Sequence, residues 1–72
     1  MKVNKSQATM LILKMLLDDG YIVKDEIMTI LEINDLSFSR YIQEIKAFFC
    51  NFDIGLEVEY LRSENRYVLI KE

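Results

Sequence analysis

Apolar residues recur along this chain first at helical spacing and later at strand spacing. Between Asn34 and Phe49 they fall three and four residues apart, which places them on one stripe of an α-helix. The stripe consists of Phe38, Ile42, Ile45 and Phe49. From Leu56 onward apolar and charged residues alternate, as in a half-buried β-strand. The pattern therefore predicts helices followed by strands.

Two further helices are predicted before this one. Ser6 is the expected N-cap of the first, which runs to about Asp19, and Gly20 follows where a left-handed residue would end it. The second runs from about Lys24 to Glu32. Its buried edge is expected to contain Ile27, Ile30 and Leu31.

Short segments connect these helices and continue into a hairpin. The three β-favouring residues 21–23 predict a brief strand between the first two helices. Asn34 is the expected N-cap of the third helix, and so short a connection after Glu32 requires a sharp turn, as in a helix-turn-helix. Residues 62–65 favour a turn between a strand beginning at Leu56 and a strand from Arg66 to Ile70.

The predicted order is α, β, α, α, β, β, which is an α+β fold of the winged helix-turn-helix type. Its 72 residues are enough for one small domain, 1–72, with a three-helix core and a C-terminal β-hairpin wing. The residues expected to share the core are Leu13, Leu16, Ile27, Leu31, Phe38, Ile42, Ile45, Val58, Tyr67 and Leu69.

The side of the third helix opposite its apolar stripe is polar enough to contact DNA. Arg40 and Gln43 lie on it, and Ser37 and Ser39 accompany them near the N-terminal end, where DNA-reading helices contact bases. Arg62 and Arg66 flank the predicted wing tip, from which a cation can reach a phosphate. The competing interpretations are a surface pair between Arg40 and Glu44, solvated serines, and edge-strand charges that deter aggregation.

The segment LKMLLDDGYIVKDEIMTILEINDLSFSRYIQEIKAFF, with EVEYLRSENRYVLIKE after it, resembles the N-terminal DNA-binding domain of bacterial WYL-type and DeoR-type regulators. Asn34, Ser37 and the triplet 40–42 match the cap, hydroxyl and Arg-Asp-Ile positions of that family, with a Tyr in place of the Asp. The resemblance implies a cytoplasmic transcriptional regulator that places this helix in the major groove of double-stranded DNA. Asp35 stands where the family commonly has a basic residue, and Val23 where it has a Ser or Thr cap.

Composition changes this interpretation in two respects. Nine basic and 12 acidic residues give a net charge of −3, which is unusual for a nucleic-acid binder and predicts weak binding. The chain has no His and a single Cys, Cys50, so neither a zinc site nor a Cys/His catalytic pair is expected. We therefore expect no enzyme activity, no cofactor and no metal. We also expect no membrane association, because the apolar run 10–17 is too short to span a bilayer.

Two apolar surfaces are also compatible with partners other than DNA, namely a second copy of the chain or another protein. Ala8, Leu11 and Met15 widen the apolar arc of the first helix, which fits either a central helix or the interface of a homodimer. Four residues at the end of the third helix are expected to join the core or to cover the sheet, and exposed together they would instead form a surface for a protein partner: Phe48, Phe49, Cys50 and Phe52. The alternative function is thus a protein-interaction winged helix, such as an antirepressor or an assembly adaptor. A further expectation is that the chain is an excised N-terminal domain, because the family's effector region would begin where it stops.

Overall fold

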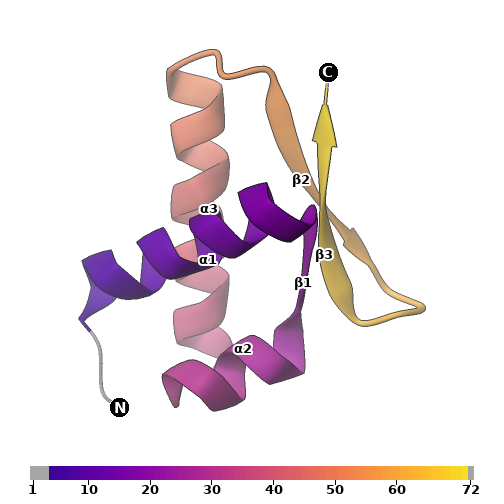
Figure 1. Ribbon diagram of the computed structural model, residues 1–72. Coiled ribbons are helices and arrows are strands. Elements are labelled where there is room, and N and C mark those ends of the chain that lie inside the picture. Colours follow the sequence, from indigo (N-terminus) through magenta and orange to yellow (C-terminus); the bar gives the residue numbers. More distant parts are fainter. Residues whose placement is uncertain (1–3, 72) are drawn as a thin grey trace.

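The computed structural model describes residues 4–71 (Figure 1). Within them, three helices and three strands follow in the order α1 (Lys5–Asp19), β1 (Tyr21–Val23), α2 (Lys24–Leu31), α3 (Asp35–Asn51), β2 (Leu56–Leu61) and β3 (Arg66–Lys71). The hairpin β2–β3 pairs with β1 into an antiparallel sheet of order β1-β3-β2. The predicted α+β class is confirmed, and the topology is winged-helix-like.

The ends of α1 follow from two residues with different roles. Asn4, not the predicted Ser6, is the N-cap, because its side-chain oxygen accepts a hydrogen bond of 2.8 Å from the amide of Gln7. Ser6 lies inside the first turn. The prediction for the other end is confirmed, since Gly20 has φ 83° and its amide donates to the carbonyl of Leu16. A left-handed residue at this position ends the helix and lets the chain enter β1.

The helix-turn-helix formed by α2 and α3 is as tight as predicted. Glu32 adopts φ 55° directly after α2, and the Asn34 side chain accepts from the amide of Ser37 at 2.8 Å to start α3. Val23 precedes α2 without a side-chain cap. The amide of Lys24 instead donates, at 3.4 Å, to the carbonyl of Asn65 in the wing turn. The wing therefore completes the N-terminus of α2.

The core lies between the three helices and the inner face of the sheet. Its buried residues are Ala8, Ile12, Leu16, Ile22, Ile27, Leu31, Phe38, Ile42, Ile45, Phe49 and Val58. Leu13, Tyr67 and Leu69 are partly buried and pack against this cluster, so every predicted core position contributes to it. Ile30 was wrongly placed on the buried edge of α2. It is 54% exposed, because the side of α2 that packs against the core contains Ile27, Met28 and Leu31, and Ile30 lies beyond the edge of that side.

Helix α1 is the central element. It contacts α3, β1 and β3, and Figure 1 shows it crossing α3 at a steep angle. Most of its wide apolar arc therefore serves the core. Ala8 is fully buried, which fits the central-helix interpretation at that position, while Leu11 and Met15 are partly buried and the homodimer interface stays a prediction there.

Candidate nucleic-acid interface

The first turns of α3 bring the predicted contact residues together on one side of the helix. Ser39, Arg40 and Gln43 are exposed, and they face away from the stripe that contains Phe38 and Ile42. Ser37 is half-buried, with its amide bonded to the Asn34 cap. The arrangement offers hydroxyl, amide and guanidinium groups within the length of a recognition helix.

Arg40 has an unengaged guanidinium. Among residues 4–71 it forms no ion pair within 4.0 Å, so the competing interpretation of a surface pair with Glu44 does not apply. Glu44 instead lies 3.9 Å from the ammonium of Lys5 on α1. Arg40 can therefore contact an external anion without first breaking an internal contact.

An ion pair joins the starts of α2 and α3. The ammonium of Lys24 lies 2.7 Å from the carboxylate of Asp35, and this hydrogen bond raises the pKa of Lys24. Asp35 is the acid that would repel a phosphate approaching the N-terminus of α3. Because the ammonium of Lys24 offsets the charge of Asp35, an anion that approaches the N-terminus of α3 meets less electrostatic repulsion than the sequence suggests. Sequence analysis missed the pair, which forms only when the two helices turn against each other.

The two wing arginines differ in their surroundings. Arg62 is exposed in the turn, and no ion pair with it occurs among the described residues. Arg66 is half-buried, pairs with Glu64, and its guanidinium carbon lies 4.9 Å from the ring centre of Tyr21. It occupies the central strand of the sheet, so the edge-strand interpretation does not apply to it. Of these two arginines, Arg62 is the one available to an external anion, whereas Arg66 already has partners within the protein.

Asn65 connects the wing turn to α2. Its side-chain oxygen accepts a 2.7 Å hydrogen bond from the hydroxyl of Tyr60, and its side-chain nitrogen donates to Asp25 at 3.0 Å. Its own φ is 50°, a left-handed conformation that Asn tolerates better than most residues. The sequence indicated only a turn former here. The contacts with α2 fix where the wing lies relative to the helix-turn-helix.

The aromatic residues of the wing complete this connection. The ring of Tyr67 lies 4.8 Å from that of Tyr60 and 5.4 Å from that of Phe38, measured between centroids. Burial raises the pKa of Tyr67 above its ordinary value of 10.0. The wing is thus anchored to the core by tilted ring contacts of Tyr67, and to α2 by Asn65 at the turn.

The end of α3 carries a different kind of surface. Phe49 is buried, but Phe48 and Phe52 are 40% and 69% exposed, and their ring centres are 5.4 Å apart. The two rings form an exposed aromatic pair at the end of α3 remote from Arg40. This is the arrangement that favours a protein partner.

Other kinds of site find no support in the described part of the chain. Residues 4–71 contain no group of three or more His, Cys, Asp or Glu side chains placed to hold a metal ion. No helix among them is long and apolar enough to cross a membrane. Comparison of the chain with family models, with curated proteins and with solved structures gave no match.

Proposed function

We propose that this domain binds double-stranded DNA, with α3 in the major groove and the wing on the phosphate backbone. The observation that carries the proposal is the exposed group of Ser39, Arg40 and Gln43, in which Arg40 forms no ion pair with any residue of the range 4–71. A guanidinium at this position of a recognition helix can contact a phosphate or the edge of a guanine. The proposal extends to the domain's role in a cytoplasmic transcriptional regulator resembling the WYL or DeoR type.

Two contacts support this docking mode. The Lys24–Asp35 pair offsets the acid at the start of α3. Asn65 fastens the wing turn to α2, so Arg62 is carried on a fixed support rather than on a loose loop. A preorganised surface loses less conformational entropy on binding. With a net charge of −3, however, we expect low affinity and a steep dependence on salt.

The experiment is a low-salt titration of the folded domain against duplexes from the region upstream of its own gene and against a random duplex. Arg40→Ala should weaken binding by ~1–3 kcal/mol. Arg62→Ala should lower the salt slope by about one unit. Arg66→Ala should have a smaller effect, because that guanidinium is engaged by Glu64 and Tyr21. Lys14→Ala, which removes a cation from α1, is the matched control.

Two outcomes would count against the proposal. If the folded wild-type protein binds neither duplex at low salt, DNA binding is rejected. If it binds but Arg40→Ala and Lys14→Ala behave alike, the docking geometry is wrong although DNA remains the ligand.

A second candidate function is a protein-interaction module, such as an antirepressor or an assembly adaptor. The exposed Phe48 and Phe52 pair and the acidic charge balance favour it. Phe52→Ser should leave DNA binding unchanged and abolish binding to such a partner. If Phe52→Ser instead keeps its binding to the partner and loses its binding to DNA, the aromatic pair is not the partner surface.

A further inference from the structure

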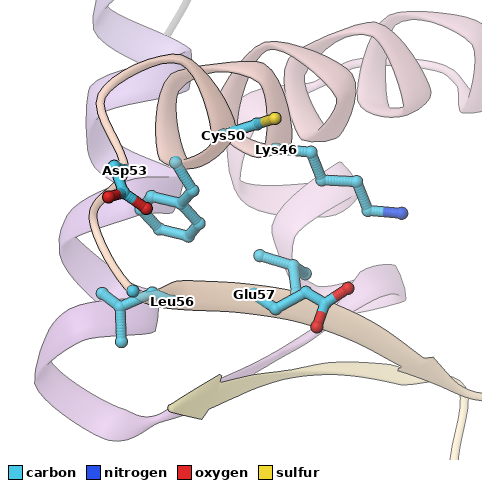
Figure 2. Close-up of a pocket in the computed structure, with 8 residues that line it drawn as sticks. Lys46, Cys50, Asp53, Leu56 and Glu57 are labelled. Carbon is cyan, nitrogen blue, oxygen red and sulfur yellow. The ribbon is translucent and has the colours of Figure 1, made fainter. Parts of the chain in front are cut away.

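A groove runs between the last turns of α3 and the start of β2 (Figure 2). Its volume is about 390 Å³. In Figure 2, Lys46 and Cys50 lie on the α3 side and Leu56 and Glu57 on the strand side. The buried side chains of Phe49 and Val58 supply apolar walls. The groove therefore combines an apolar interior with a charged rim.

The strand that borders this groove is an edge of the sheet. Antiparallel strands alternate, residue by residue, between backbone groups that face one neighbour and groups that face the other. The amide of Leu69 donates to the carbonyl of Gly20 at 2.8 Å, so Leu69 faces the β1 side of the central strand. Its neighbours Val68 and Ile70 consequently face β2.

The register transfers this alternation to β2. Glu59 is opposite Val68 and Glu57 is opposite Ile70, so the backbone groups of these two glutamates pair with β3. The N–H and C=O groups of Leu56, Val58 and Tyr60 then point to the outer edge. No strand within residues 4–71 pairs with that edge.

We propose that an extended segment of a partner protein adds to the outer edge of β2 as a fourth strand. Strand addition of this kind takes its affinity from backbone hydrogen bonds and its selectivity from pockets for alternate side chains. Here the groove beside Phe49 and Val58 receives an apolar side chain of the partner. The groove lies at the end of α3 remote from Arg40, and the test of this proposal uses no DNA, so its failure is distinguishable from a failure of DNA binding.

Charge defines the chemistry of the partner. Asp53, Glu57 and Glu59 are exposed along the groove and strand, against the single cation Lys46 in the groove lining. The added segment should therefore alternate apolar residues with Lys or Arg. Opposite charges on neighbouring strands attract each other, and like charges directly opposite are destabilising.

The same argument disfavours a second copy of this chain as the occupant. Two β2 strands paired antiparallel about Val58 would place Glu57 of each copy opposite Glu59 of the other. Both contacts bring carboxylates together, and each domain already has a net charge of −3. A basic segment of another protein avoids this repulsion.

Cys50 provides a built-in reporter for the test. It is the only cysteine of the chain, is exposed and lines the groove. The probe is an acetylated and amidated hexapeptide in which lysine and valine alternate. It should slow alkylation of Cys50 by iodoacetamide in a dose-dependent manner and shift the amide resonances of Leu56, Val58 and Tyr60. A hexapeptide alternating glutamate and valine should bind at least about tenfold more weakly.

Backbone and charge variants make the test specific. Methylating the amides on the face of the peptide that pairs with β2 should abolish binding, while methylating the alternate amides should have little effect. The double substitution E57K/E59K should reverse the preference between the two peptides, and Glu26→Lys on α2 should not. All three glutamates are exposed, so these variants should fold.

Three results would overturn the proposal. One is equal loss of binding with either methylation pattern, and another is the absence of Cys50 protection by the lysine peptide. The third is protection that appears on raising the concentration of the protein alone, which would identify a second copy as the occupant. None of these results depends on whether the domain binds DNA.

Discussion

Asn65→Asp tests whether the wing is held in place by the contact between Asn65 and Asp25. The substitution keeps a residue that tolerates the left-handed conformation, and it keeps an oxygen that can accept from Tyr60. It replaces the amide group that donates to Asp25 at 3.0 Å with a second carboxylate. The substitution therefore perturbs one contact, between two residues that are 40 positions apart in the sequence.

The expected cost has two parts. A hydrogen bond to a charged group contributes ~1.5–3 kcal/mol, towards the low end at an exposed site such as this. Two carboxylates about 4 Å apart repel by ~1 kcal/mol in water and by ~4 kcal/mol near a protein surface, less whatever they recover by rotating apart. We expect Asn65→Asp to lower the free energy of unfolding by roughly 1–3 kcal/mol. Added salt should reduce the repulsive part of this loss.

A double-mutant cycle with Asp25→Asn isolates the contact. In that background the new carboxylate at position 65 faces an amide, so Asn65→Asp should be almost neutral. Urea unfolding followed by circular dichroism gives the four free energies, and hydrogen exchange at residues 62–65 reports on the wing. A coupling energy within about 0.3 kcal/mol of zero would refute the inference that this contact fixes the wing.

Three further predictions concern the core, an ion pair and α1. Ile42→Ala should cost ~2–5 kcal/mol in urea unfolding, because Ile42 is buried on the inner stripe of α3, and a fully stable variant would contradict that packing. Asp35 raises the folded-state pKa of Lys24 above its ordinary value of 10.5, so their stabilisation should persist at lower pH and disappear as pH rises through the raised pKa. Unfolding measured across alkaline pH should show a larger decline in wild type than in Asp35→Asn, because the raised pKa of Tyr67 contributes a decline to both proteins. Leu11→Glu should unfold much of the domain and Leu17→Glu should not, since only Leu11 packs against the core, and equal effects would refute this difference.

Most of the fold could be predicted because it depends on neighbours in the sequence. Gly20 ends α1 and Asn34 starts α3 through contacts with residues three or four positions away. The stripe of Phe38 and Ile42 likewise follows from the period of a single helix. The prediction of Ser6 as the N-cap of α1 was wrong because Asn4 and Ser6 are both good caps, and spacing alone does not distinguish them.

The candidate site depends on contacts that no local pattern contains. The Lys24–Asp35 pair requires the turn between α2 and α3, and the partners of Asn65 come from α2 and β2. The exposure of Ile30 similarly depends on which side of α2 the rest of the fold covers. Periodicity shows which residues of a helix form its apolar stripe, but it does not show which residues of that stripe become buried.

The wing is held differently from the rest of the molecule, and this bears on any function that uses it. Residues 66–70 of β3 are all only partly buried and β2 contributes one buried side chain, Val58, whereas α3 contributes four buried side chains. Besides Val58, the position of the wing therefore depends on strand pairing, on the tilted ring contact of Tyr60 with Tyr67, and on the polar contacts of Asn65. Such contacts are weaker and more exposed than core packing, so the hairpin should open before the helices do. A ligand that contacts both α3 and the wing would then stabilise the hairpin specifically, whereas a strand added to the edge of β2 would stabilise it without involving Arg40. Hydrogen exchange at the hairpin, measured with each ligand in wild type and in Arg40→Ala, separates the two modes of binding.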